Sequence, residues 1–144
     1  MLVGISPLIS PALLETLHRM GHGDEIVFAD AHFPAESLGP RCIRADGLCI
    51  ADLLDAVLPL LALDDYVDAP VTMMAGVSGE IADPALGAAY QELITKHWPG
   101  TPPITRIERF DFYARAGKAF TIVASGDTAK YANIILKKGV TPSL

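Results

Sequence analysis

The run EIVFAD at residues 25–30 places four apolar residues in a row and closes them with an aspartate. A short continuous apolar run is typical of a strand that is buried on both faces, as in a parallel sheet covered by helices. Comparable runs recur at 71–77, 119–125 and 134–137. The sequence therefore predicts four buried strands, and ligands of such sheets gather where the strands end.

Helical patterns separate these runs. Ser10-Pro11 predicts a helix start, because serine caps the first turn and proline is tolerated at the first helical position, and Gly21 predicts the end of that helix. Further helices are predicted at 50–61, from Asp83-Pro84 to about 98, and at 109–118. Pro59 is expected to kink or end the first of these three. The alternation of strands and helices predicts an α/β fold, a three-layer sandwich whose mostly parallel sheet is covered by helices on both faces.

The composition restricts the class of protein. The chain of 144 residues is expected to form a single domain over 1–144, and its 51% apolar content favours a homo-oligomer with an apolar interface. A net charge of −6 with scattered basic residues argues against a nucleic-acid partner. No apolar stretch reaches the roughly 20 residues that span a membrane, and no secretory signal is recognisable, so we expect a cytoplasmic location.

The two cysteines carry no recognisable motif. Cys42 and Cys49 form neither a CxxC pair nor part of a disulfide framework. We expect both to be reduced, half-buried thiols without a catalytic role.

His22 lies in the least ordinary stretch of the chain, MGHGDE at 20–25. It is either a polar residue of a surface turn with no chemical role or an imidazole presented at a cleft, where it could transfer a proton near neutral pH. Asp30 and His32 follow a predicted strand, although an aspartate there is also a common turn former. His18 and His22 have the spacing of two metal ligands on one helix, but Gly21 interrupts that helix, so no metal site is expected.

Two further groups of polar residues could serve a site. Arg109 and Tyr113 share a helix face if 109–118 is helical, either as site residues or as part of a half-buried aromatic stripe with a surface arginine. Tyr131 and Asn133 offer a phenol and an amide, which can bind sugar hydroxyls or simply form a turn. No glycine-rich phosphate loop is present in the sequence, so no nucleotide cofactor is expected. These residues alone do not select a reaction.

Four motifs follow one another along the chain: GHGDE at 21–25, DAHFP at 30–34, RFDFYARAGKAF at 109–120 and YANIILKKG at 131–139. In these motifs, and from end to end, the chain resembles the fucose mutarotase and ribose pyranase family. The Gly-His-Gly form and IRADG at 43–47 are similar to the fucose branch of that family. Residues 79–103 match least and are expected to carry no site residue.

The resemblance implies an activity and a set of site residues. It implies interconversion of the α and β forms of free L-fucose or a close relative, without cofactor or metal, in a homo-oligomeric ring such as a decamer. It also implies that His22 is the proton donor and that six polar residues contact the sugar: Asp30, Asp64, Arg109, Tyr113, Tyr131 and Asn133. A pyranose–furanose converter of the ribose branch and a non-catalytic sugar-binding protein remain the alternatives.

Overall fold

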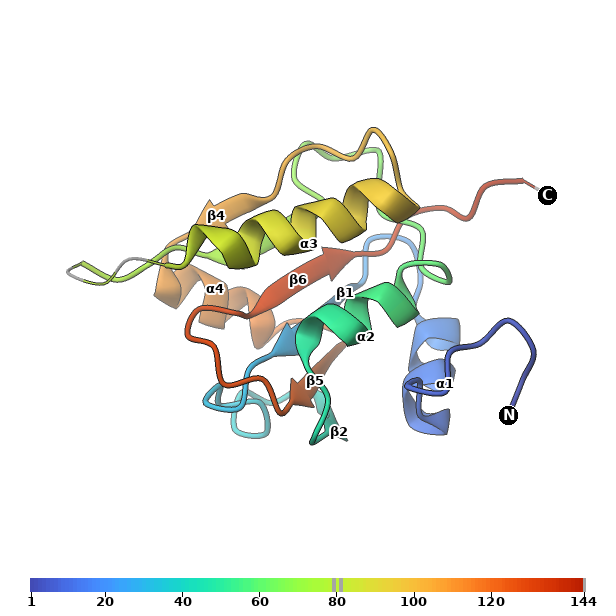
Figure 1. The fold of residues 1–144 in the computed structure, drawn as a ribbon, viewed down its shortest axis with the longest axis horizontal. Coiled ribbons are helices and arrows are strands. Elements are labelled where there is room, and N and C mark those ends of the chain that lie inside the picture. The colour runs from blue at the N-terminus through green and yellow to red at the C-terminus, as the bar shows by residue number, and fades with distance from the viewer. Residues whose placement is uncertain (79, 81, 144) are drawn as a thin grey trace.

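A six-stranded sheet forms the centre of the computed structural model, which describes residues 1–78, 80 and 82–143 (Figure 1). The strands are β1 (Glu25–Ala29), β2 (Arg41–Ala45), β3 (Val71–Met74), β4 (Thr105–Ile107), β5 (Thr121–Ser125) and β6 (Ile134–Lys137). Their order across the sheet is β2-β5-β1-β6-β3-β4. The pairs β2–β5, β5–β1 and β3–β4 are parallel, whereas β6 runs antiparallel to both of its neighbours. The prediction of a mostly parallel sheet is confirmed.

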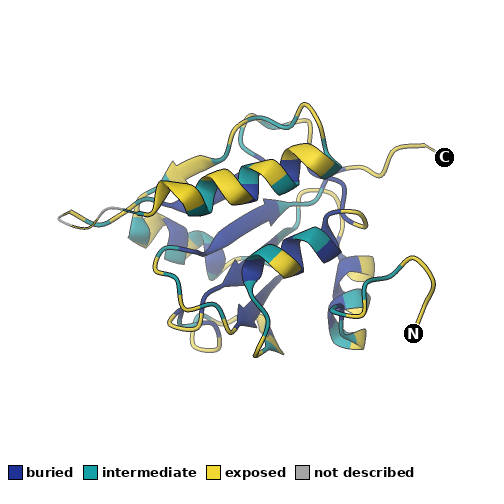
Figure 2. Ribbon diagram, in the orientation of Figure 1, coloured by how far each residue is buried: buried dark blue, intermediate teal, exposed yellow. Residues whose placement is uncertain are grey.

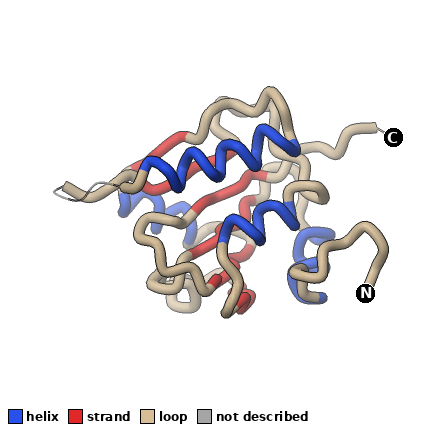
Figure 3. Tube along the Cα trace, in the orientation of Figure 1, coloured by secondary structure: helices blue, strands red, loops and turns tan. Residues whose placement is uncertain are grey.

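Helices lie on both faces of this sheet: in Figure 3 two blue helices cross in front of the red strands and another lies behind them, and Figure 1 labels these α2, α3 and α4. The helices are α1 (Pro11–Arg19), α2 (Ile50–Val57), α3 (Pro84–His97) and α4 (Arg109–Ala116). The first three helices pack into one apolar cluster with residues such as Phe28 and Ile134. The fourth packs into a second cluster with Val27 and Ile135 on the other face. Successive strand residues point to opposite faces, so each buried strand supplies both clusters.

Local signals explain where the helices begin and end. The Ser10 Oγ accepts a hydrogen bond from the Leu13 N–H at 3.2 Å, and the Asp83 carboxylate caps α3 in the same way. The second helix ends at Val57, two residues before Pro59, as expected for a residue that cannot continue a helix. No helix in the described parts of the chain is long and apolar enough to cross a membrane.

The four strands predicted from apolar runs are the central ones, β1, β3, β5 and β6, and Figure 2 shows them as the buried centre of the molecule. The third strand is shorter than predicted, since it ends at Met74. The strands that the sequence did not predict, β2 and β4, lie at the two edges of the sheet. Their residues are largely exposed or only half-buried, so they lack the continuous apolar run that marks a central strand.

The direction of β6 positions polar residues at both ends of the sheet. Because it runs against its neighbours, the residues before β6 meet the carboxyl ends of β1 and β3, and the residues after it meet their amino ends. The turn before β1 therefore lies beside residues that follow β6, and the Gly23 N–H donates to the Lys138 carbonyl at 2.8 Å.

Candidate functional site

The carboxyl end of β1 brings together two polar residues from distant parts of the chain. Asp30 directly follows β1, and Asn133 directly precedes β6. The Asp30 main-chain N–H donates to the Asn133 Oδ1 at 2.8 Å, and both residues are buried. Because this bond uses the amide oxygen, the Asn133 NH₂ group remains as a donor for other groups.

Asp30 is held by its own turn. The His32 main-chain N–H donates to the Asp30 Oδ1 at 2.9 Å, so the carboxylate is oriented locally. Burial raises the pKa of this carboxyl above its ordinary value of 3.8, although the His32 N–H and imidazole act in the opposite direction. A buried carboxylate beside a cavity can accept hydrogen bonds from a polar ligand such as a sugar hydroxyl.

These two residues line a cavity of about 290 Å³. Five of the seven site residues that the family resemblance implies line it: Asp30, Arg109, Tyr113, Tyr131 and Asn133. An apolar wall completes it, formed by Phe33, Met74 and Val77. Convergent polar groups opposite an apolar wall are the usual chemistry of a small-molecule site. The structure therefore gathers most of the candidate residues at one place.

Helix α4 supplies one side of this cavity. Its first turn is capped by the Glu108 carboxylate, which accepts from the Phe110 N–H at 2.8 Å. Arg109 and Tyr113 are four apart, and both line the cavity, as the helical prediction required. The Tyr113 ring packs edge-on against Phe33, with 5.3 Å between the ring centroids.

The hydrogen bonding of the Arg109 side chain is incomplete among the described residues. Its guanidinium carbon lies 4.6 Å from the centroid of the Phe110 ring. Its Nε is buried, and within the described residues it has no hydrogen-bond partner. A buried donor without a partner costs free energy unless a ligand or another chain satisfies it.

Tyr131 enters the cavity from a strained turn. Its φ of 58° lies in the left-handed region, which residues other than glycine rarely adopt. Its hydroxyl donates to the Glu80 Oε2 at 2.5 Å, and Lys130 Nζ lies 3.4 Å from the other carboxylate oxygen. The bond to Glu80 raises the pKa of Tyr131 and lowers that of Glu80. Backbone strain beside a cavity is characteristic of functional sites.

Glu80 corrects one expectation. The segment 79–103 was predicted to carry no site residue, yet Glu80 lines the cavity and holds the Tyr131 hydroxyl. The two residues are 51 positions apart, so no local spacing in the sequence relates them. Residues 79 and 81 of this segment lie outside the described part of the chain.

His22 and Asp64 form a separate pair at the amino end of β1. The His22 Nε2 lies 3.0 Å from the Asp64 Oδ1, which also accepts from the Tyr66 main-chain N–H at 3.1 Å. The His22 side chain is 46% exposed, whereas that of Asp64 is 3% exposed. The Tyr66 ring packs beside the imidazole, with 5.3 Å between centroids.

The ionisation of Asp64 suits a carboxylate that pairs with a proton-donating imidazole. Burial alone would raise its pKa, but hydrogen bonds from the Tyr66 N–H and His22, with the charge of Lys137, lower the pKa below its ordinary value of 3.8. The carboxylate is therefore ionised at neutral pH. An ionised carboxylate on one ring nitrogen orients an imidazole and stabilises its protonated form.

Within a single chain, the His22–Asp64 pair and the cavity lie at opposite ends of β1. His22 precedes β1 and Asp30 follows it, so a strand of five residues separates them, which is roughly 17 Å at 3.3 Å per residue. His18 lies on α1, and His32 belongs to the cavity at the far end of the strand. Throughout 1–78, 80 and 82–143, no three His, Cys, Asp or Glu side chains are grouped in a way that could hold a metal ion.

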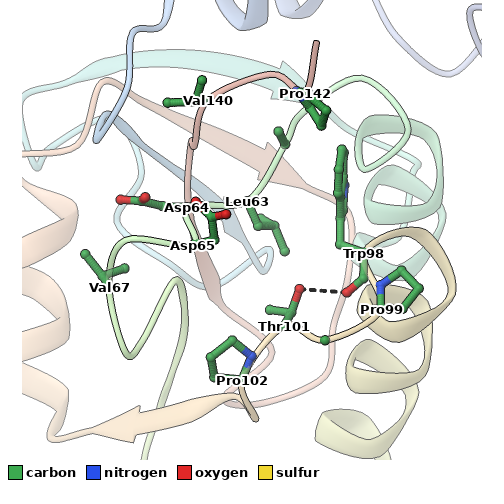
Figure 4. Close-up of a pocket in the computed structure, with 12 residues that line it drawn as sticks. Leu63, Asp64, Asp65, Val67, Trp98, Pro99, Thr101, Pro102, Val140 and Pro142 are labelled. Atoms are coloured by element: carbon green, nitrogen blue, oxygen red, sulfur yellow. Dashed lines mark hydrogen bonds between the residues drawn. The ribbon is translucent and has the colours of Figure 1, made fainter. Parts of the chain in front are cut away.

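A larger cavity, of about 380 Å³, lies between the loop that carries Asp64, the turn after α3 and the C-terminal segment (Figure 4). The Asp64 carboxylate points away from the Trp98 side of this cavity. The hydroxyl of Thr101 is already bonded to the Trp98 carbonyl at 2.7 Å. We assign the candidate site to the smaller cavity, where buried polar groups converge.

Comparison with known proteins identifies the family. Residues 3–141 match the RbsD / FucU transport protein family. The chain belongs to the RbsD/FucU family. A fucose mutarotase from Streptococcus pneumoniae, solved in complex with L-fucose, is 49% identical to this family member with a TM-score of 0.93, and the match covers 98% of this chain and 100% of that one.

Two further solved structures are similar to this RbsD/FucU chain to different degrees. FucU from Bifidobacterium longum is 45% identical with a TM-score of 0.91, over 96% of this chain and 99% of that one. RbsD from Bacillus subtilis, complexed with D-ribose, is 22% identical with a TM-score of 0.78, over 99% of this chain and 100% of that one. The likeness to that RbsD extends to the fold, whereas the likeness to the two fucose-type proteins extends to nearly half of all residues.

Proposed function

We propose that this protein is a mutarotase that interconverts the α and β anomers of free L-fucose or a close relative. The observation that carries the proposal is the cavity in which Asp30, Arg109, Tyr113, Tyr131 and Asn133 converge. The 49% identity with a fucose mutarotase solved with L-fucose supports the same substrate class. The apolar wall of the cavity suits the methyl group that distinguishes a 6-deoxy sugar from its hydroxymethyl counterpart.

The reaction needs proton transfer and positioning. The ring oxygen gains a proton while the anomeric hydroxyl loses one, the ring opens to the aldehyde, the bond next to C1 rotates, and the ring closes on the other face. No oxidation state changes, so acid–base groups and hydroxyl-binding groups are sufficient and neither a metal nor a cofactor is required. His22 is the proposed proton donor, and the polar residues of the cavity hold the hydroxyls.

We further propose that two copies of the chain complete each site. His22 must lie within about 3–3.5 Å of a reacting atom, but in one chain it lies at the opposite end of β1 from Asp30. Exposed aromatic side chains flank both halves: Tyr66 beside His22, and Phe110 beside Arg109. An interface that buries these rings would bring the His22 of one subunit to the cavity of its neighbour. A ring such as a decamer is the proposed assembly, and the cytoplasm is the proposed location.

Saturation-transfer NMR tests the activity directly. We expect the protein to accelerate exchange between the anomers of L-fucose, with less effect on D-galactose and D-ribose. Exchange on ribose alone would assign the protein to pyranose–furanose conversion. Line broadening on fucose without exchange would make it a sugar-binding protein and would overturn the proposal.

A further inference from the structure

Residues 137–139, which are the last residue of β6 and the two residues after it, contact the turn that carries His22. The Gly23 N–H donates to the Lys138 carbonyl, and the Lys138 N–H donates to the Asp24 carbonyl, both at 2.8 Å. The His22 turn is therefore bound to this segment by two main-chain hydrogen bonds. The imidazole itself makes few contacts, since its side chain is 46% exposed and the Asp64 carboxylate is its hydrogen-bond partner.

The same segment contacts the loop that carries Asp64. The Asp64 N–H donates to the Lys137 carbonyl at 3.0 Å, and the Gly139 N–H donates to the Ala62 carbonyl at 2.7 Å. The approach is close, because a Cβ at Gly139 would lie 2.5 Å from the Leu63 carbonyl oxygen. Figure 4 shows the chain before Val140 passing beside this loop. Residues 137–139 thus lie between the two halves of the His22–Asp64 pair and bind both.

The Lys138 side chain adds a third connection. Its ammonium donates to the carbonyls of Leu17 at 2.9 Å and Met20 at 2.5 Å. These carbonyls belong to the end of α1 and its cap, where the helix leaves its last acceptors without partners. The ammonium therefore fixes the point from which the chain departs into the His22 turn.

We propose that Lys138 is a positioning residue for the proposed reaction: its ammonium anchors the end of α1 to the segment 137–139, which binds both the His22 turn and the Asp64 loop, and so holds the imidazole at hydrogen-bond distance from the carboxylate. The inference rests on the proposed function in taking His22 as the proton donor. A proton donor displaced by an ångström loses much of its effect even when the substrate still binds. Lys138 lies on the amino side of the sheet with His22 and is not among the residues that line the cavity with Asp30.

The test compares Lys138→Met with Lys96→Met. The second variant is a matched control, because the Lys96 ammonium contacts the exposed Asp55 carboxylate at 3.0 Å on another part of the surface. For each folded variant, exchange NMR gives kcat and KM on L-fucose, and ¹³C NMR follows the titration of the Asp64 carboxyl. His22→Gln provides the pKa that Asp64 has without an imidazole. If Lys138→Met is recovered unfolded, Lys138→Gln, which keeps an uncharged NH₂ donor group, takes its place.

We expect Lys138→Met to lower kcat on the order of 10- to 100-fold with little change in KM. We also expect the pKa of Asp64 to rise toward its value in His22→Gln, while Lys96→Met matches the wild type in both measurements. A Lys138→Met protein that is only less heat-stable, with kcat and the Asp64 titration unchanged, would overturn the inference. If the wild-type protein does not exchange fucose anomers, the proposed function fails, and the Asp64 titration alone still decides whether Lys138 positions the pair.

Discussion

His22 contributes its imidazole to the proposed chemistry and little to the stability of the fold. It is half-exposed and lies in a turn between two glycines, so its removal leaves no buried cavity. We expect His22→Ala to fold with a modestly lower melting temperature, since Asp64 loses one hydrogen-bond partner, to bind L-fucose weakly, and to lose anomer exchange by about 100-fold or more. Exchange NMR and thermal unfolding measure both parts. Exchange at the wild-type rate would remove His22 from the mechanism.

Asp64 is expected to affect both stability and catalysis. A carboxyl with a lowered pKa stabilises the folded state above its ordinary pKa, and this stabilisation is lost as the pH falls through the folded pKa. Asp64→Asn should therefore be about 1–3 kcal/mol less stable than the wild type at neutral pH, because hydrogen bonds to a buried charged group become weaker bonds to a neutral amide.

Urea unfolding at several pH values checks this expectation. The difference in unfolding free energy between Asp64→Asn and the wild type should be constant above about pH 5 and should shrink below the ordinary pKa of 3.8. A difference that grows as the pH falls would contradict the assignment of Asp64 as an ionised carboxylate. In kinetics, adding Asp64→Asn to His22→Ala should cause little further loss, since the two residues act as a unit.

At the scale of elements, the antiparallel direction of β6 is what assembles the cavity. It brings Asn133 to the carboxyl end of β1, where the amide oxygen accepts the Asp30 N–H at 2.8 Å. Asn133→Ala should lower stability by about 1–3 kcal/mol, because it leaves this buried N–H without a partner, and should raise KM for L-fucose. Denaturant unfolding and exchange kinetics measure the two effects.

Ser125→Ala is the matched control for this edge of the sheet. The buried Ser125 hydroxyl donates to the Ala29 carbonyl at 2.7 Å at the end of β5, but Ser125 is not among the residues that line the cavity. A comparable loss of stability with an unchanged KM is expected. If both variants raised KM equally, the effect of Asn133 would be structural rather than a contact with the sugar.

At the scale of the whole molecule, we expect a stable homo-oligomer. The exposed large apolar side chains include Leu2 and Val3 near the N-terminus as well as the aromatic rings beside His22 and Arg109. Light scattering at low micromolar concentration should give a mass several times 15.3 kDa. A fully active monomer would rule out a site shared between subunits.

Mixing impaired variants, assayed at an L-fucose concentration below the raised KM of Asn133→Ala, tests the shared site more sharply. His22 and Asn133 lie at opposite ends of β1, so in a shared site each would come from a different subunit. After subunit exchange in an equal mixture of His22→Ala and Asn133→Ala, about a quarter of the sites should combine an intact donor side with an intact cavity and regain activity. His22→Ala mixed with Asp64→Asn is the control, since both lesions lie on one side and no recovery is expected. Equal recovery in the two mixtures, or none in either, would contradict the shared site.

Periodicity and capping determined much of this protein from sequence alone. Continuous apolar runs are recognisable for every strand buried on both faces, and Ser10 and Asp83 mark helix starts because a cap is a local interaction. Edge strands such as β2 (Arg41–Ala45) were not predicted, since a half-exposed strand has no continuous apolar run. Five residues of the cavity were recognised through the resemblance of their motifs, whereas Glu80 was not, and the helical spacing of Arg109 and Tyr113 indicated a common face.

Only the tertiary structure decided which of those residues meet. The direction of β6 depends on pairings between distant segments, and it places Asn133 beside Asp30 across 103 positions. Long-range contacts likewise join His22 to Asp64 across 42 positions and Tyr131 to Glu80 across 51. Local patterns favoured a mostly parallel sheet but did not single out β6 as the strand that runs against its neighbours, because an antiparallel strand that is buried on both faces has the same continuous apolar run. The separation of the His22–Asp64 pair from the candidate cavity follows from that topology, and the proposal of a site shared between two subunits rests on it.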